Sequence, residues 1–183
     1  LKVSVISQDD FYIGANAMVG QDLSMANFDS LTALNTDQFL LTLREIKNGN
    51  QSLIQIPNYN HSTQSPDGFK DITLKQIVLV EGHLIFTSQD IFDLVDFNIY
   101  MDVDRNTGKI RRFTRDVMER GYNKEECEAY YNNYVIQTLD MIESLKCKAD
   151  FVIDARAGAD TYISQIEKML LLVESKGGWY DRG

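Results

Sequence analysis

Short apolar runs alternate along this chain with longer segments in which apolar residues recur at every third or fourth position. The clearest run, 77–80, is Ile-Val-Leu-Val and leads directly into Glu81 and Gly82. An apolar run of this length, rich in β-branched residues, predicts a strand that is buried on both faces. Similar patterns predict further strands at 3–7, 53–56, 97–102 and 151–154.

Helical spacing marks the segments between these strands. Phe39, Leu43 and Ile46 recur on one helix face. Thr36 can cap the start of this helix, and Gly49 lies where the helix can end with a residue in the left-handed conformation. Strands that alternate with helices predict an α/β fold, with a parallel sheet covered by helices on both faces. The other predicted helices are at 88–95, 110–121, 124–145 and 163–173.

The remaining segments are rich in turn residues. We expect a mobile loop at 13–26, a turn at 27–30 and a polar, turn-rich segment at 58–69. The 183 residues, 44% of them hydrophobic, suffice for a single domain over 1–183 with its own core. Because the chain opens within a predicted strand and without Met, we expect that residue 1 is not the native start.

The net charge of −9 changes the range of partners to expect. It argues against nucleic acid or an anionic membrane as the main partner, and it leaves small anionic substrates open. Cys127 and Cys147 form no metal-spaced pair, so we interpret them as reduced thiols in a cytosolic protein. From the residues given, we expect neither a signal peptide nor a membrane-spanning run. The positive charges crowd into one stretch, at Lys109, Arg111, Arg112, Arg115 and Arg120.

Two acids follow predicted strands directly. Asp9 comes after the strand at 3–7, and Glu81 comes after the strand at 77–80. Ligands of open α/β sheets bind at the carboxyl ends of strands, so the two acids suggest a site between them. Asp9 can equally cap a turn, and Glu81 can simply close a strand end. The residues alone leave these alternatives open.

Five short motifs follow one another along the chain, and their order and spacing closely resemble the uridine kinase family of P-loop kinases. The resemblance runs from Val3 to about Ala159. A second resemblance, to nicotinamide riboside kinase, rests on Gln8-Asp9-Asp10-Phe11 and on Asp29 followed by Ala33-Leu34-Asn35. The five motifs are Ser7-Gln8-Asp9-Asp10-Phe11-Tyr12, Asn27-Phe28-Asp29, Ile56-Pro57-Asn58-Tyr59, Val80-Glu81-Gly82 and Arg111-Arg112 with Arg115-Asp116 and Glu119-Arg120-Gly121.

The resemblance implies a magnesium-dependent transfer of phosphate from ATP. At the position of Asp9 the family has an acid that acts as base toward the 5′-hydroxyl of the nucleoside and lies close to Mg²⁺. Glu81 matches the acid that holds Mg²⁺, usually through water. We therefore expect Asp9 and Glu81 to approach each other closely enough to share the ion, with the arginine-rich helix facing them.

The resemblance also implies an acceptor site. Asp29 matches the acid that receives the ribose hydroxyls, although Asn-x-Asp is also a common turn cap. Phe28 resembles a ring of the sugar pocket and can equally be core, and Tyr59 matches an aromatic residue near the base or lies at the rim. The other acceptor-site candidates are Tyr12, His83, Arg112 and Tyr122.

Arg115 and Arg120 resemble the arginines of a lid at about 105–125 that clamp the phosphates. A solvated basic surface is the alternative. The base-reading residues depart from the family pattern: Gln64 and Pro66, or His61 in a gapped alignment, replace a histidine and an arginine. Tyr122, Tyr130 and His83 also stand where the family has other residues. They could stack on a different ring such as nicotinamide, or they could be ordinary helix-packing residues, an alternative that applies above all to Tyr130.

No Gly-x-x-x-x-Gly-Lys-Ser/Thr motif occurs in the chain. The family places it just ahead of the strand that begins here at Val3, so we expect a first strand and phosphate-binding loop upstream. The resemblance then implies a cytoplasmic uridine or cytidine kinase of pyrimidine salvage, with ATP and Mg²⁺ as cofactors and no nucleic-acid or membrane partner. It leaves a homo-oligomer open. The alternatives are a kinase for nicotinamide riboside or another small molecule, and an inactive binding domain.

Overall fold

The computed structural model describes residues 2–19 and 26–176. The chain divides into two compact units, the first running through Asp96 and the second beginning at Phe97. The expectation of a single domain with a lid at about 105–125 stays a prediction.

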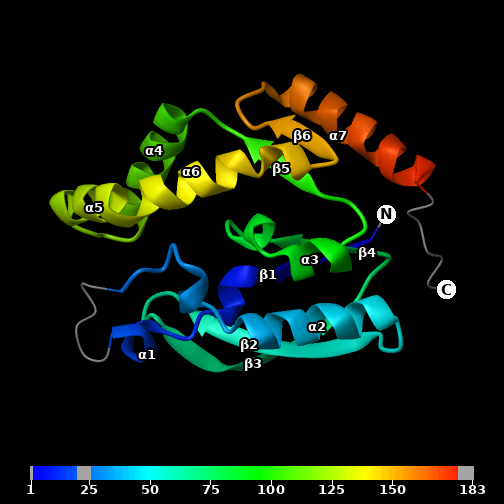
Figure 1. The fold of residues 1–183 in the computed structure, drawn as a ribbon, viewed down its shortest axis with the longest axis horizontal. Helices are drawn as coiled ribbons and strands as arrows, with labels where there is room; N and C mark the ends of the chain where they lie inside the picture. The colour runs from blue at the N-terminus through cyan, green and yellow to red at the C-terminus, as the bar shows by residue number, and fades with distance from the viewer. Residues whose placement is uncertain (1, 20–25, 177–183) are drawn as a thin grey trace. The chain divides into compact units, whose positions relative to one another are not determined.

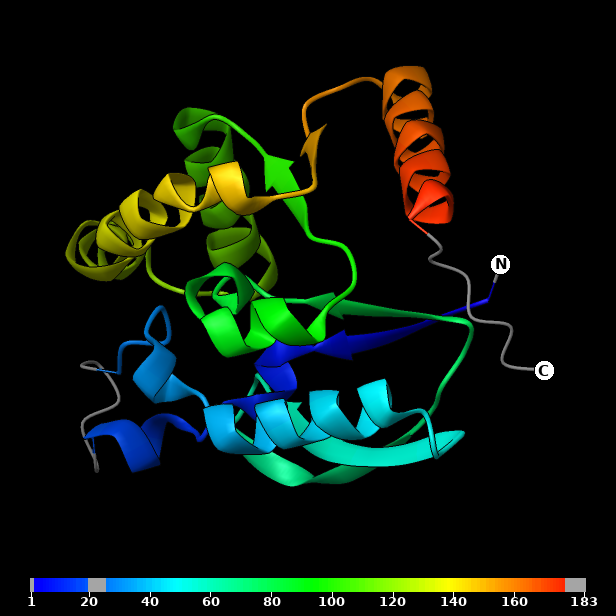
Figure 2. The same cartoon turned by 45° about the vertical axis from the view of Figure 1, so that its right-hand side comes forward.

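Two parallel strands organise the first unit (Figure 2). β1 (Val3–Ser7) pairs with β4 (Ile77–Glu81), with Val3 opposite Ile77 and Ser7 opposite Glu81. The two predicted strands therefore end at the same sheet edge. The expectation that they are buried on both faces is wrong for these residues. Ile6 is fully buried, whereas Val3 and Val5 are each 49% exposed and Leu79 is 43% exposed.

The period of two along a strand explains this difference. Ser4 and Ile6 lie on the covered face of β1, and Val3 and Val5 lie on the other face. An apolar run shows that both faces tolerate burial, but it cannot show which faces other elements cover.

The core of the first unit lies between α2 (Thr36–Asn48), the strand β2 (Leu53–Asn60) and the covered face of β1 (Figure 1). α2 is the predicted helix. Its cap is Asn35 and not Thr36, since the Asn35 side chain accepts the N–H of Gln38 at 3.2 Å. Gly49 ends the helix in the left-handed conformation, as predicted. The core residues are Ile6, Phe11, Phe39, Leu40, Leu43, Ile46, Ile54, Ile56, Leu74 and Ile91.

An antiparallel hairpin replaces the expected polar segment at 58–69. β2 does not end at Pro57 but continues to Asn60, and it pairs with β3 (Ser65–Thr73). The pairing is irregular between Pro57 and Tyr59, which is where proline is tolerated in a strand. The exposed positions of β3 carry Pro, Asp, Gly and Thr besides Phe69, which is 63% exposed, so its sequence lacks the apolar signal of a strand.

Short elements complete the first unit. α1 (Ala15–Val19) occupies part of the expected loop at 13–26, and 20–25 lie outside the described residues. The expected turn at 27–30 is present at Phe28 and Asp29. The expected helix at 88–95 is α3 (Gln89–Leu94). The short 3₁₀ turns are η1 (Gln8–Phe11), η3 (Leu31–Ala33) and η4 (Ile85–Thr87).

The second unit also contains a parallel strand pair, β5 (Ile99–Asp102) with β6 (Phe151–Asp154). Asp102 lies opposite Asp154, so both strands end in acid at one edge. The structure confirms these two predicted strands. Together with the β1–β4 pair and the flanking helices, they give the expected α/β class, to which the hairpin adds an antiparallel part.

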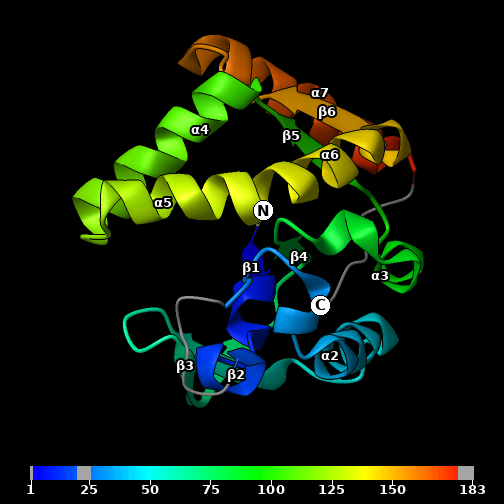
Figure 3. The ribbon, with the colours of Figure 1, turned by 60° about the vertical axis from the view of Figure 1, so that its left-hand side comes forward.

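Long helices make up the rest of the second unit (Figure 3). α4 (Arg105–Thr114) continues into a π-helical turn, η5 (Arg115–Glu119). α5 (Lys124–Tyr130), the π-helical turn η6 (Tyr131–Val135) and α6 (Ile136–Ser144) form one rod, which corresponds to the helix predicted at 124–145. The 3₁₀ turn η7 (Lys146–Lys148) and the closing helix α7 (Ala159–Ser175) follow. Within the described ranges, no helix combines the length and apolarity needed to cross a membrane.

Candidate active site

Asp9 and Glu81 come from adjacent strand ends. β1 ends at Ser7, which pairs with Glu81, and Asp9 follows in the first turn of η1. The Ser7 hydroxyl accepts the N–H of Asp9 at 3.3 Å, so Ser7 and not Asp9 caps this turn. The Asp9 side chain is partly buried, and Glu81 is exposed. The predicted pair thus reaches the same edge of the β1–β4 sheet.

Gln8 ties the loop after β4 to this edge, a role that the sequence did not indicate. Its buried side-chain oxygen accepts the N–H of Leu84 at 3.1 Å. A Cβ on Gly82 would lie only 2.4 Å from the Cβ of Gln8. Glycine is therefore required at position 82 for the loop that follows Glu81 to pass this close to η1.

Aromatic rings gather beside this edge. The Tyr12 ring lies 5.4 Å from the Phe28 ring and 5.3 Å from the Tyr59 ring, measured between centroids. The Tyr12 hydroxyl donates to the Phe28 carbonyl at 3.0 Å. His61 extends the group, with its ring 5.2 Å from that of Tyr59. The structure thus brings together three predicted acceptor-site residues, and it includes the histidine of the gapped alignment.

Asp29 joins the same neighbourhood through His83. The Asp29 carboxylate is buried, and its Oδ1 lies 3.6 Å from the His83 Nε2. Asn27 accepts the N–H of Asp29, and Ser30 caps η3, so Asp29 is not the turn cap that the sequence left open. A buried carboxylate with a histidine beside it can accept hydrogen bonds from hydroxyl groups.

Asp10 and Lys70 form an ion pair that sequence reasoning missed. The Lys70 Nζ lies 2.7 Å from Oδ1 of the nearly buried Asp10. This pair joins η1 to β3 of the hairpin. Lys70 lies 60 positions from Asp10, so no local pattern in the sequence indicated this ion pair. The second acid of the Asp9-Asp10 pair was the one hint that a partner was needed.

In the second unit, the predicted lid arginines Arg115 and Arg120 and the acceptor-site candidate Arg112 converge on a single carboxylate, that of Asp116. The distances to Asp116 oxygens are 3.5 Å from Arg112, 2.9 Å from Arg115 and 3.3 Å from Arg120. Asp116 is only 7% exposed. Tyr122 donates its backbone N–H to the Asp116 carbonyl at 3.0 Å. The sequence indicated the arginines but not the acid that collects them.

Cys127 lies in the electrostatic field of the same group. Burial raises the pKa of the Cys127 thiol, the Asp116 charge raises it further, and Arg112 opposes the shift. Cys127 and Cys147 form no disulfide, as expected.

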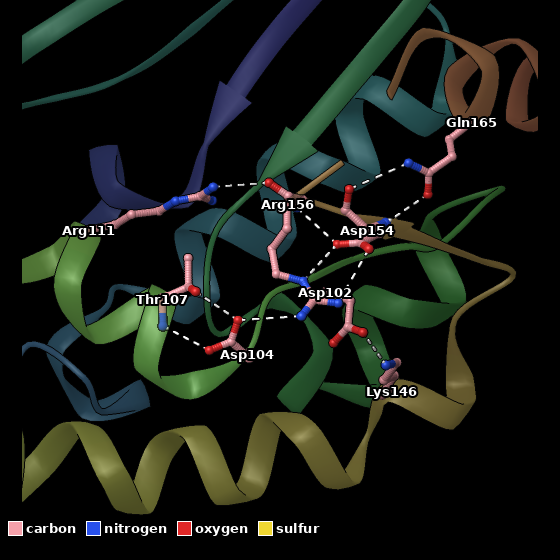
Figure 4. Close-up of polar contacts among 9 residues, drawn as sticks. Asp102, Asp104, Thr107, Arg111, Lys146, Asp154, Arg156 and Gln165 are labelled. Atoms are coloured by element: carbon pink, nitrogen blue, oxygen red, sulfur yellow. Dashed lines mark hydrogen bonds and ion pairs between the residues drawn. The ribbon is translucent and has the colours of Figure 1, made fainter. Parts of the chain in front are cut away.

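A second group of charges lies at the carboxyl ends of β5 and β6 (Figure 4). Asp102 pairs with Lys146 at 2.7 Å, and Arg156 binds Asp154 at 3.1 Å. Asp104 caps α4 through the N–H of Thr107 at 2.9 Å. These contacts with Arg156 and Thr107 hold the pKa values of Asp154 and Asp104, respectively, below the ordinary carboxyl value. Asp102, Asp104 and Asp154 therefore each have a partner within the second unit, and these contacts stabilise the ends of β5 and β6 and the start of α4.

The His, Cys, Asp and Glu side chains are the candidate donors for a metal ion in this protein. Among residues 2–19 and 26–176, no three or more His, Cys, Asp or Glu side chains are grouped so that they could hold a metal ion. Mg²⁺ typically takes one or two protein carboxylates and completes its shell with water and substrate phosphates. Asp9 and Glu81, from adjacent strand ends, are two carboxylates of this kind, and the expectation that they share an ion stays a prediction.

Comparisons with known proteins agree on one family. A family model described as "Phosphoribulokinase / Uridine kinase family" matches residues 3–162. The uridine kinase of Shewanella amazonensis is 29% identical over 168 residues, which cover 91% of this chain and 78% of that protein. Uridine/cytidine kinase UKL1, chloroplastic, of Arabidopsis thaliana is 26% identical over 162 residues, 88% of this chain. The chain spans only 32% of that relative's length.

A solved structure supports the fold. The crystal structure of a putative fructose transport system kinase from Silicibacter sp. TM1040 matches with a TM-score of 0.66. The match covers 83% of this chain and 75% of that one at 15% sequence identity. At this identity the likeness concerns the fold alone.

Proposed function

Because the chain belongs to the phosphoribulokinase/uridine kinase family, we propose that it is part of a phosphotransferase that moves phosphate from ATP to the 5′-hydroxyl of a nucleoside. The observation that carries the proposal is the grouping within the first unit. Strand-end acids, a buried Asp29 beside His83, and a cluster of aromatic rings are the kinds of group that a polar sugar and a flat base would contact. Relatives named uridine kinase support the choice of acceptor.

Asp9 is the base in this proposal. A sugar hydroxyl is a poor nucleophile, and a neighbouring carboxylate can orient it and accept its proton as the phosphoryl group arrives. Ser7 already caps the turn, which leaves the Asp9 carboxylate for this task. Mg²⁺ held by Asp9 and Glu81, largely through water, would balance charge on the phosphates.

The other side chains bind substrate. Asp29 accepts hydrogen bonds from the ribose hydroxyls, and His83 holds it from one side. Tyr12 and Tyr59 are only 8% and 7% exposed, so in this proposal they form the inner part of the acceptor pocket. Phe28, which is less buried, offers more of its ring to the acceptor. Arg115 and Arg120 bind phosphate oxygens, for which planar guanidinium groups are suited. We propose the same role for Arg112, which the resemblance assigns to the acceptor, because it shares the Asp116 carboxylate with the other two arginines. Tyr122 stays a candidate for contact with the acceptor.

One observation favours a second acceptor. Tyr12, Tyr59 and His61 form a continuous aromatic group, and aromatic faces attract a cationic ring such as that of nicotinamide riboside. A domain that binds nucleosides without turnover is the third possibility. Location in the cytosol, a place in pyrimidine salvage and assembly into a homo-oligomer remain predictions of the same proposal.

A panel of acceptors tests the proposal. The full-length protein is incubated with ATP, Mg²⁺ and either uridine, cytidine, adenosine or nicotinamide riboside, and ADP release is measured. We expect release with uridine or cytidine. Release with nicotinamide riboside alone would establish the second acceptor. Nucleoside binding by calorimetry without any ADP release would show an inactive binding domain and overturn the proposal.

A further inference from the structure

The group formed by Arg112, Arg115, Arg120 and Asp116 has an unusual distribution of burial. The Asp116 side chain is about nine-tenths buried, whereas the three arginine side chains are between 29% and 44% exposed. The carboxylate therefore lies on the inside, and the three cations lie around it with part of each side chain in solvent.

The spacing of the four residues produces this arrangement. Arg112 and Arg120 each lie four positions from Asp116, so all three share one helix face. Arg115 precedes Asp116 and reaches it with Nε at 3.0 Å and Nη2 at 2.9 Å. The π-helical turn η5 brings residues five apart into register, since the N–H of Arg120 donates to the Arg115 carbonyl at 3.1 Å. π-helical turns of this kind are frequent at functional sites.

Cations outnumber anions among the four members of this group. One carboxylate, that of Asp116, faces three guanidinium groups. Without the carboxylate, three like charges at this spacing would repel one another and move apart. Arg112 has a second constraint, because its guanidinium lies 5.5 Å from the centre of the Tyr130 ring.

We propose that Asp116 is the positioning residue of the phosphate-binding arginines: it gathers Arg112, Arg115 and Arg120 into one cationic group before the donor nucleotide arrives. The inference rests on the proposed phosphotransferase function for the identity of the anion. Gathering the cations in advance lowers the cost of orienting three flexible side chains on binding. Asp116 does not touch the substrate, and its effect passes through the arginines.

The test uses Asp116→Asn, which keeps the size of the side chain and removes its charge. Glu125→Gln, an exposed acid in the first turn of α5, is the matched control for loss of one negative charge. We expect Asp116→Asn to raise KM for ATP about 10- to 100-fold while KM for the nucleoside stays within about twofold. The control should leave both constants unchanged.

A binding measurement separates this inference from the proposed function. Calorimetric titration of the full-length protein with inorganic tripolyphosphate requires no turnover. We expect the wild-type protein to bind it and Asp116→Asn to bind it at least about tenfold more weakly. If ADP release is absent but this difference is found, the proposed function fails and the role of Asp116 holds. Equal affinities, or no binding by either protein, would overturn the role of Asp116.

Cys127 reports whether the variant keeps its local structure. In a Cys147→Ser background, the rate of Cys127 alkylation by iodoacetamide is followed against pH. Removal of the Asp116 charge should lower the pKa of Cys127, because that charge raises it in the wild type. This shift with an unchanged KM for ATP would show a purely structural role.

If Asp116→Asn does not fold, Asp116→Glu keeps the charge on a longer side chain. It should fold and show a smaller increase in KM for ATP. If Asp116→Glu has both the wild-type KM for ATP and the wild-type affinity for tripolyphosphate, the placement of the carboxylate does not affect phosphate binding, and the positioning role of Asp116 is overturned.

Discussion

Asp9 and Asp10 are neighbours in sequence but lie in different environments. The Asp10 carboxylate is nearly buried and binds Lys70 at 2.7 Å, so it joins η1 to the hairpin. Asp9 begins the turn that Ser7 caps, at the sheet edge shared with Glu81. The same residue type therefore serves structure at one position and is placed for chemistry at the next.

This difference predicts opposite outcomes for two identical substitutions. Asp9→Asn should abolish ADP release and leave the free energy of unfolding almost unchanged, because it removes the proposed base and no buried ion pair. Asp10→Asn should lower the free energy of unfolding by about 1–2 kcal/mol, since Lys70 is partly exposed and solvent weakens the pair. Urea denaturation and an ADP-release assay measure the two effects. Wild-type turnover by Asp9→Asn would remove Asp9 from its role.

At the scale of the element, α2 shows how a helix is closed at both ends. The Asn35 side chain accepts the N–H of Gln38 and donates to the Gln38 side chain at 3.1 Å. Gly49 ends the helix with a φ of 69°, a conformation that costs glycine little. Between these caps, Phe39, Leu43 and Ile46 supply the buried face that α2 packs into the core.

Substitution at the two candidate caps of α2 tests this description. Asn35→Ala should lower the free energy of unfolding by about 1 kcal/mol, because the Gln38 N–H loses its acceptor. Thr36→Ala is the matched control at the first helical position and should change stability by less than about 0.5 kcal/mol. Thermal or urea denaturation measures both. A larger effect at Thr36 than at Asn35 would restore the capping role that the sequence suggested for Thr36.

At the scale of the whole molecule, an acidic chain keeps several carboxylates ionised through fixed partners. For Asp150, burial raises the pKa, but Lys176 and the Asn98 N–H bind the carboxylate and hold its pKa below the ordinary value. The pKa values of Asp104 and Asp154 are lowered as well. All three carboxylates lie in the second unit, and their lowered pKa values all predict that acid destabilises this unit.

The sign of this effect follows from linkage. A carboxyl whose pKa is lowered in the folded state takes up its proton first in the unfolded state, so stability is present above the ordinary pKa and is lost as pH falls through the folded value. The urea midpoint should therefore be lower at about pH 3 than at about pH 7. Asp150→Asn, which keeps an oxygen for the Asn98 N–H, should reduce the difference between the two midpoints. An increased difference in that variant would contradict the assignment.

The sequence by itself determined the kind and order of most elements. The runs at 3–7, 77–81 and 151–154 became strands, and the stripe at 124–145 became one helical rod, because apolar runs and helical spacing act within a few residues. Motif order was enough to single out Tyr12, Phe28 and Asp29, which the structure gathers in one neighbourhood with His83.

Only the tertiary structure decided which residues contact one another across long distances in the sequence. Gln8 meets Leu84 across 76 positions and Asp10 meets Lys70 across 60, and no local pattern marks either contact. The hairpin strand β3 was hidden because its stability comes from pairing with β2 and not from its own apolar residues. The Asp116 group differs, because Arg112, Arg115 and Arg120 lie one or four positions from Asp116 along one helical segment, so their spacing in the sequence already allows these contacts. For the long-range contacts, local sequence sets the conformation of each segment, but the path of the backbone and the packing of side chains decide which residues meet.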